Sequence, residues 1–135
     1  MGKVVVLFVD DEEDFRTLSI RQIRRIVKNI EFEFLEAGNG QQALEMLKGG
    51  LKPSVIIVDY AMPKINGMEL MKMIDSDNPD LHDVPRIMIS GYNQEELVRE
   101  AQGMRCAFFE KRIDTKVFFQ EVCQYMSTKL GFSYP

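Results

Sequence analysis

Apolar runs of strand length alternate along this chain with segments in which apolar residues recur every three or four positions. The runs are typical of buried strands and the periodic segments of helices, so the pattern indicates repeated βα units. Turn-forming residues separate the units. We predict five strands near 4–9, 31–36, 55–59, 86–90 and 107–109, and five helices near 13–28, 40–48, 66–75, 94–102 and 114–129.

The second predicted strand differs from the others. Its segment 31–34 alternates strictly between charged and apolar residues, whereas the runs at 4–9, 55–58 and 86–89 are almost continuously apolar. Alternation indicates one solvated face, and a continuous run indicates a strand covered on both faces. We therefore expect the second strand at an edge, in a flavodoxin-like α/β fold with a doubly wound, five-stranded parallel sheet in the order 2-1-3-4-5.

Charged residues follow three of the predicted strands. Asp10 and Asp11 follow the first, Asp59 ends the third, and Lys111 follows the fifth. The carboxyl ends of parallel strands share one edge, and the first and third strands are neighbours in this order, so the four side chains are expected to meet. Carboxylates about 4 Å apart repel by roughly 1 kcal/mol per pair in water and about 4 kcal/mol near a protein surface. The cluster therefore needs a cation, and Mg²⁺ suits oxygen ligands.

The length and composition of the chain indicate one globular domain with a normal hydrophobic core. The chain has 135 residues, of which 45% are hydrophobic and 28% charged, so a second domain has no room. The net charge is -4 and no sustained basic stripe occurs, so we expect no direct binding to nucleic acid. The two cysteines form no metal motif, and neither a signal peptide nor a membrane-length apolar run is present. We expect a cytoplasmic protein without membrane contact.

Four short motifs, each at the end of a predicted strand, match a known family. They are Val9-Asp10-Asp11-Glu12, Val58-Asp59-Tyr60-Ala61-Met62-Pro63 with Gly67, Met88-Ile89-Ser90-Gly91, and Phe108-Phe109-Glu110-Lys111. In this order they resemble the CheY-like receiver domain of bacterial two-component response regulators, over about residues 3–130. On this resemblance residues 1–130 form the receiver domain and residues 131–135 a C-terminal tail.

The resemblance implies a role for each residue of the acidic cluster. Asp59 is the expected phosphoacceptor, and Asp10, Asp11 and Asp59 are expected to hold Mg²⁺ with the backbone carbonyl of Ala61. Lys111 is expected to contact the phosphoryl group. General chemistry agrees, because a carboxylate can attack phosphorus to give an aspartyl phosphate, and the transfer requires positioning and charge neutralisation. Asp59 is the best nucleophile because it follows a buried strand and precedes a loop that can wrap the site.

Two more residues are assigned to the response that follows phosphorylation. By the same resemblance Ser90 is the switch hydroxyl, and Phe108, three residues before Lys111, stands at the aromatic switch position. Movement of Ser90 toward the phosphate is expected to vacate space into which Phe108 turns. That movement changes the surface of the fourth helix, fifth strand and fifth helix. In the alternative interpretation Phe108 is a core residue and Ser90 belongs to an ordinary turn.

Two positions depart from the family pattern. Arg112 follows Lys111 where receivers usually carry proline, and a cis peptide bond costs far more without proline. A trans bond would move Lys111 relative to Asp59. Tyr92 is expected to line the mouth of the site beside the small Ala61, where an aromatic ring hinders the hydrolytic water and lengthens the lifetime of the aspartyl phosphate.

The function expected on this resemblance is phosphorelay signal transduction. The domain accepts a phosphoryl group from a sensor histidine kinase or a histidine phosphotransfer protein. It then signals to a downstream effector protein, or to an effector domain absent from this chain. It is not an enzyme, apart from self-catalysed phosphorylation and dephosphorylation.

Three alternatives belong to other functional classes. The main one is a degenerate receiver that acts as a phosphorylation-independent interaction module. A Mg²⁺-dependent phosphohydrolase is disfavoured because its second aspartate, two residues after the first, is replaced here by Ala61. An FMN-binding flavodoxin is disfavoured because the acidic segment 10–14 would repel a phosphate.

Overall fold

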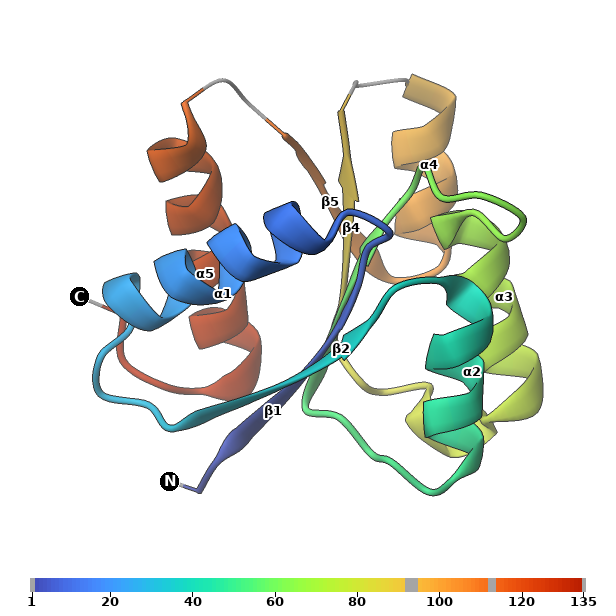
Figure 1. Ribbon diagram of the computed structural model, residues 1–135, viewed down its shortest axis with the longest axis horizontal. Helices are drawn as coiled ribbons and strands as arrows, with labels where there is room; N and C mark the ends of the chain where they lie inside the picture. The colour runs from blue at the N-terminus through green and yellow to red at the C-terminus, as the bar shows by residue number, and fades with distance from the viewer. Residues whose placement is uncertain (1, 92–94, 112–113, 135) are drawn as a thin grey trace.

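One parallel sheet with helices on both faces makes up the computed structural model, which describes residues 2–91, 95–111 and 114–134 (Figure 1). The strands, in the spatial order β2-β1-β3-β4-β5, are β1 (Val4–Val9), β2 (Phe32–Ala37), β3 (Val55–Asp59), β4 (Arg86–Ser90) and β5 (Cys106–Glu110). The helices are α1 (Glu13–Ile26), α2 (Gly40–Lys48), α3 (Gly67–Asp77), α4 (Glu95–Gly103) and α5 (Thr115–Leu130), with a short 3-10 helix η1 (Pro79–Leu81). The predicted fold class, strand order and edge position of β2 are confirmed.

Element boundaries differ from the predicted ones by one or two residues at several ends. The helix expected over 13–28 ends at Ile26, because Val27 takes an extended conformation. The helix expected from residue 66 begins at Gly67, because Asn66 is its N-cap in a capping box with Glu69. The 3-10 helix η1 was not predicted, since its three residues are too few for a periodic pattern. None of these shifts moves a predicted site residue between elements.

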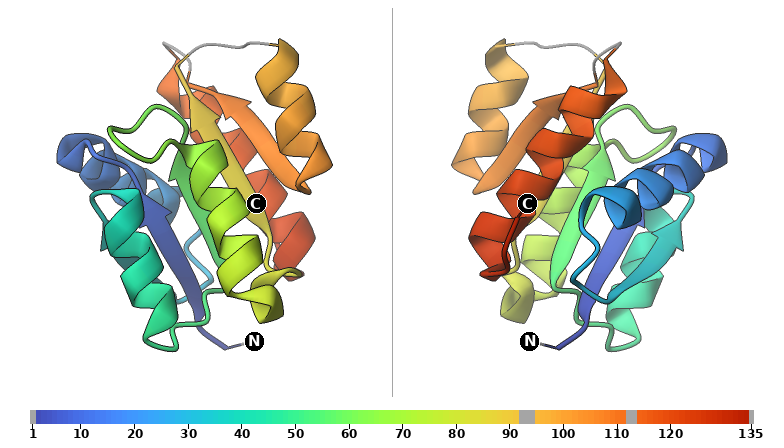
Figure 2. Two further views of the ribbon diagram at one scale, coloured as in Figure 1. Left: turned by 90° about the vertical axis from the view of Figure 1, so that its right-hand side faces the viewer. Right: turned by 90° about the vertical axis from the view of Figure 1, so that its left-hand side faces the viewer.

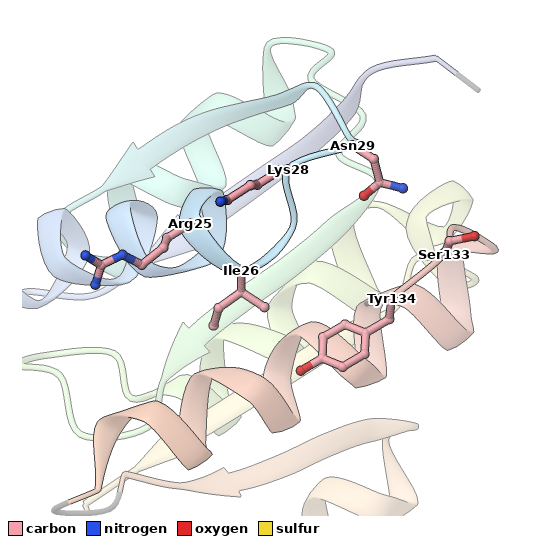
Figure 3. A pocket seen from close by; sticks show the side chains of 6 residues that line it. All are labelled: Arg25, Ile26, Lys28, Asn29, Ser133 and Tyr134. Carbon is pink, nitrogen blue, oxygen red and sulfur yellow. The ribbon is translucent and has the colours of Figure 1, made fainter.

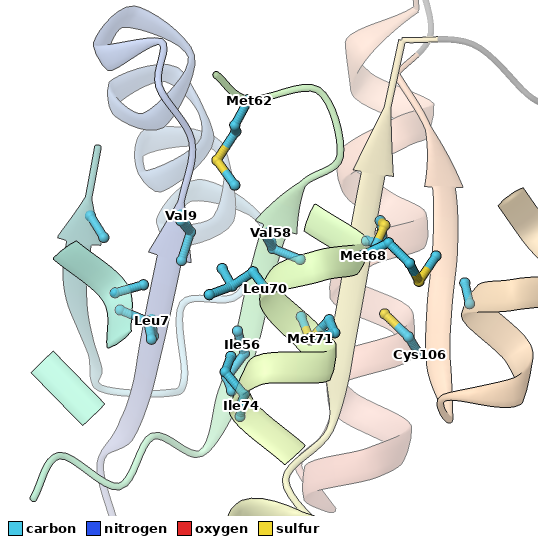
Figure 4. Close-up of a cluster of buried hydrophobic side chains, with 14 of the residues drawn as sticks. Leu7, Val9, Ile56, Val58, Met62, Met68, Leu70, Met71, Ile74 and Cys106 are labelled. Carbon is cyan, nitrogen blue, oxygen red and sulfur yellow. The ribbon is translucent and has the colours of Figure 1, made fainter. Parts of the chain in front are cut away.

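Alternate residues of the central strands face opposite sides of the sheet, which explains their continuous apolar runs. Leu7, Val58 and Met88 belong to a core cluster on the side of α2, α3 and α4 (Figure 4). Phe8 and Ile57 belong to a second cluster on the side of α1 and α5. The two views of Figure 2 show α2 and α3 in front of the sheet on one side and α1 and α5 on the other. The sheet is therefore covered on both faces.

Gly67 brings the start of α3 against the carboxyl end of β3. A Cβ atom at this position would lie 2.7 Å from the carbonyl oxygen of Asp59 and 2.9 Å from the Cα of Tyr60. Backbone atoms cannot yield as flexible side chains do, so only glycine fits here without a shift. The amide of Gly67 also donates to the carbonyl of Tyr60 at 2.8 Å. The loop after Asp59 is thereby held close to the strand that it leaves.

The segment after α5 folds back onto the domain. Gly131 takes a left-handed conformation with φ 78° and ends the helix. Phe132 is buried, and its ring packs edge-on against Phe32 of β2 at a centroid distance of 6.2 Å. Beyond it, Tyr134 lines a surface hollow with residues from the end of α1 (Figure 3). Within the described residues, no helix is both long and apolar enough to cross a membrane.

Candidate functional site

The three predicted carboxylates meet at the carboxyl edge of the sheet. Asp10 and Asp11 follow β1, Asp59 ends β3, and these two strands are neighbours. One carboxylate oxygen from each residue lies within 4.8 Å of the other two. Asp10 and Asp59 are buried and Asp11 is exposed. Asp11 therefore forms a solvent-accessible side of the cluster.

Lys111 reaches this cluster from the end of β5. Its Nζ lies 3.4 Å from Oδ1 of Asp59 and 3.6 Å from Oδ2 of Asp10. The backbone amide of Lys111 donates to the carbonyl of Ser90 at 2.7 Å, which ties the start of the loop to β4. The ammonium therefore contacts both buried carboxylates in a chain that carries Arg112 in place of proline. Arg112 itself lies outside the described residues.

Burial makes the cluster electrostatically costly without a bound cation. Burial raises the pKa of Asp59 to about 6, and the charge of Asp10 adds to this effect, while Lys111 opposes it. Burial also raises the pKa of Asp10, although the backbone amide of Glu12 donates to its Oδ1 at 2.9 Å and lowers the pKa in part. The single positive charge of Lys111 does not balance the negative charges of three neighbouring carboxylates.

One oxygen of the cluster lacks a hydrogen bond. Oδ2 of Asp10 is buried and accepts none from the residues that the structure describes. A buried polar atom in a native protein normally has a partner, and an unpaired one points to an ion or water that the protein binds. All the donors are oxygens, two of them from buried carboxylates, and such a set fits a hard divalent cation.

Ser90 lies at the end of β4, the strand next to Asp59, and Phe108 lies on the following strand, β5. Ser90 is buried at the end of β4, in register with Glu110 of β5, and its neighbour Ile89 is paired with Asp59. Phe108 is partly buried on β5 and packs against the core cluster on the side of α4. Ser90 therefore directly follows Ile89, the residue that is paired with the predicted phosphoacceptor Asp59.

Two other residues, Ala61 and Tyr92, are predicted to line the mouth of the site. Ala61 is exposed in the loop after Asp59, where a small side chain leaves the approach open. Tyr92, expected beside Ala61, lies outside the described residues. The predicted effect of its ring on water is therefore untested.

Two residues of α1 contact the site and were not predicted. Arg16 Nη1 donates to the backbone carbonyl of Asp10 at 2.5 Å, and its Nε donates to Glu36 Oε1 at 3.0 Å. The ring of Phe15 lies 4.2 Å from Nζ of Lys111. The sequence offers no signature for either contact, since a single arginine or phenylalanine in a helix fits equally well as a surface or a core residue.

An ion pair between a buried arginine and a partly exposed aspartate, at the opposite end of β4, was also missed. Arg86 is almost fully buried, and its Nη2 lies 2.6 Å from Oδ1 of Asp75 on α3 and donates to the carbonyl of Leu81 at 3.1 Å. His82, the single histidine, has its Nδ1 3.5 Å from the same carboxylate. Arg86 begins the strand whose other end is Ser90, so this cluster is remote from the acidic site. It is a structural ion pair.

Comparison with known proteins places this geometry in context. The family model for the response regulator receiver domain matches residues 6–122. The chain is 26% identical over 124 residues to the polar-differentiation response regulator DivK of Brucella anthropi, covering 90% of this chain and 94% of that protein. It is 35% identical over 86 residues to the chemotaxis protein CheY1 of Helicobacter pylori, covering 63% of this chain and 65% of that protein.

Solved structures share the fold. The phosphorylated cyanobacterial phytochrome response regulator RcpA superimposes with a TM-score of 0.83 at 20% identity, and the match covers 99% of both chains. The Mn²⁺-bound form of the response regulator Rcp1 superimposes with a TM-score of 0.75 at 23% identity, covering 98% of this chain and 99% of that one. At these identities the likeness extends to the architecture alone.

Proposed function

This chain belongs to the family of response regulator receiver domains and serves in phosphorelay signalling, and we propose that Asp59 is the residue that accepts the phosphoryl group. The observation that carries the proposal is the position of its buried carboxylate. It lies 3.4 Å from the ammonium of Lys111 and within the oxygen cluster of Asp10 and Asp11. A nucleophile held between a cation-binding site and an ammonium is prepared for phosphoryl transfer.

The proposed reaction is an in-line displacement at phosphorus. An oxygen of the Asp59 carboxylate attacks the phosphoryl group of a phosphohistidine and forms a new P–O bond. The P–N bond breaks, and its electron pair stays on the imidazole nitrogen, which then takes up a proton. We propose a sensor histidine kinase or a histidine phosphotransfer protein as the donor, and self-catalysed transfer from a small phosphodonor follows the same course.

Charge neutralisation is divided between two sides of Asp59. Asp10, Asp11 and Asp59, with the backbone carbonyl of Ala61, are the proposed ligands of Mg²⁺, which supplies positive charge to the phosphoryl oxygens when bound. Lys111 supplies the second positive charge, since its ammonium already contacts the carboxylate that becomes phosphorylated. The orphaned oxygen of Asp10 supports the metal assignment.

Ser90 and Phe108 are the proposed switch pair. A phosphate on Asp59 adds about two negative charges and three acceptor oxygens. Ser90 is near enough in the sheet to respond, because its neighbour Ile89 is paired with Asp59. A shift at the end of β4 would move Phe108, because β5 is hydrogen-bonded to β4. The surface of α4, β5 and α5, which a downstream effector protein would bind, would then change. The two free, buried cysteines support a reducing, cytoplasmic location.

Intact mass after incubation with acetyl phosphate tests the assignment. We expect one phosphoryl adduct that requires Mg²⁺ and that the Asp59→Asn variant lacks. Asp14→Asn, which changes an exposed carboxylate of α1 outside the cluster, is the matched control and should be phosphorylated like the wild type. A folded wild-type protein that binds Mg²⁺ but gains no adduct would favour the interaction-module alternative.

A further inference from the structure

The ammonium of Lys111 lies between two buried carboxylates and an aromatic ring. The carboxylates are those of Asp10 and Asp59, and the ring is that of Phe15, whose centroid is 4.2 Å from Nζ. A cation at this distance from an aromatic face is attracted by the ring's quadrupole. Phe15 is in the first turn of α1, directly beyond the acidic segment that follows β1. The helix therefore supplies one wall of the space that Lys111 occupies.

The ring of Phe15 is itself held in place by other aromatic side chains. Its centroid lies 6.3 Å from that of Phe8 on β1, 6.4 Å from Phe118 and 6.2 Å from Phe119, both near the start of α5. Phe8, Phe118 and Phe119 are all buried. A ring fixed on this side by three buried neighbours presents a stable surface to the ammonium.

Lys111 needs such a surface because its carboxylate partners do not define one position. Its side chain is flexible and its ammonium forms contacts without directional preference. Glu12 lies 4.0 Å away on the exposed rim and competes for the ammonium with the two buried carboxylates. Phosphoryl transfer depends on placing the charge where it meets the transferred group, and a displacement of about 1 Å can cost two orders of magnitude in rate.

We propose that Phe15 is a positioning residue for the phosphoryl-transfer reaction, acting through Lys111: its ring holds the ammonium on the inner side of the site, against Asp59 and away from Glu12. The inference rests on the proposed function of Asp59. It assigns a task to a side chain that touches neither the phosphoryl group nor the metal site.

The rate of phosphorylation by acetyl phosphate at saturating Mg²⁺ tests this role. Phe15→Leu removes the aromatic face but keeps an apolar side chain, and a cation–π contact of ordinary strength predicts a rate about three- to tenfold lower. Phe15→Tyr retains the ring and should restore most of the rate. Phe32→Leu is the matched control: it truncates a buried ring of the same core cluster that packs against Phe132, so it should lower the thermal stability and leave the rate within about twofold.

A double-mutant cycle separates positioning from general damage. In a Lys111→Met background, Phe15→Leu should cause no further loss of rate, because the residue through which Phe15 acts is gone. Rate losses that multiply would overturn the proposal, as would an unchanged rate in Phe15→Leu alone.

A spectroscopic measurement examines the contact without phosphorylation. Ring currents should shift the NMR signals of the Lys111 ε-methylene protons upfield in the wild type and in Phe32→Leu, and this shift should vanish in Phe15→Leu. Its presence in a protein that acetyl phosphate does not phosphorylate would leave the contact standing and refute the function of Asp59. Absence of the shift from the wild type would refute the contact itself.

Discussion

Nζ of Lys111, the residue directly after β5, lies 3.4 Å from Oδ1 of Asp59 at the end of β3. The pair does not neutralise the site, because Asp10 is buried beside it and Asp11 is within the same oxygen cluster. The carboxylates therefore repel one another at the position where we propose that the chemistry takes place. Proteins commonly accept such a local cost at functional sites.

The first prediction concerns the pH dependence of stability without metal. The pKa of Asp59 in the folded state is raised to about 6, above its value in an unfolded chain, so the folded protein binds the proton more tightly. This contribution to the free energy of unfolding is complete below the unfolded pKa and is lost as the pH rises through about 6. Chemical denaturation in EDTA should show a decrease of about 1 kcal/mol from about pH 5 to about pH 7.

Two variants check this pH dependence, one at the buried Asp59 and one at the exposed Asp14. Asp59→Asn should lose most of the pH effect and be more stable than the wild type near neutral pH. Asp14→Asn, at an exposed position of α1, should retain the wild-type dependence. A pH effect of the same size in Asp59→Asn would assign it to another group.

Mg²⁺ should make the wild type more stable than Asp59→Asn, the reverse of the order expected in EDTA. A ligand that binds only the folded state at a hundred times its dissociation constant adds about 2.7 kcal/mol to the free energy of unfolding. The wild type should gain an amount of this order in thermal denaturation with Mg²⁺. Asp59→Asn and Asp10→Asn, which each remove a carboxylate of the cluster, should gain far less. Equal gains in all three proteins would place the metal elsewhere.

Loss of Asp75 should destabilise the domain more than loss of both members of its ion pair. Asp75→Asn leaves the buried charge of Arg86 without its partner at 2.6 Å, and breaking a buried pair in this way costs about 3–5 kcal/mol. In the double variant Arg86→Met with Asp75→Asn no buried charge remains at this end of β4, so part of the stability should return. Urea denaturation measures both.

The exposed pair between Lys72 and Glu100 is the control for this cycle. Its two side chains are 60% and 45% exposed, so Glu100→Gln should change the free energy of unfolding by less than about 1 kcal/mol. A similarly small effect of Asp75→Asn would mean that water reaches Arg86.

Gly67→Ala should impair both stability and phosphorylation. The added Cβ would lie 2.7 Å from the carbonyl oxygen of Asp59, so either α3 or the end of β3 must shift, at a cost of about 1–3 kcal/mol. A shift of β3 would move Asp59, the proposed nucleophile, and the rate with acetyl phosphate should fall. Gly103→Ala is the control, because its Cβ would meet nothing within 4 Å. Equal rates in both variants would show that the site tolerates movement of α3.

The features predicted correctly from the sequence are those with a repeating local cause. Continuous apolar runs indicated β1, β3 and β4 because both faces of these strands are covered, and the alternation in β2 indicated an edge. The meeting of Asp10 with Asp59 followed from strand order alone, since parallel strands end at one edge. Arg86 and Asp75 were missed because a pair between a strand and a helix leaves no periodic trace.

The sequence by itself determined the fold and the list of acidic residues, because hydrophobic periodicity and strand order act through whole segments. Only the tertiary structure decided where the individual side chains lie. Whether Lys111 reaches Asp59 depends on the path of one loop, and whether Phe15 faces Lys111 depends on how α1 packs against α5. Such contacts join residues that are distant in the chain, and packing geometry sets them to within a few ångströms. No local pattern encodes that precision.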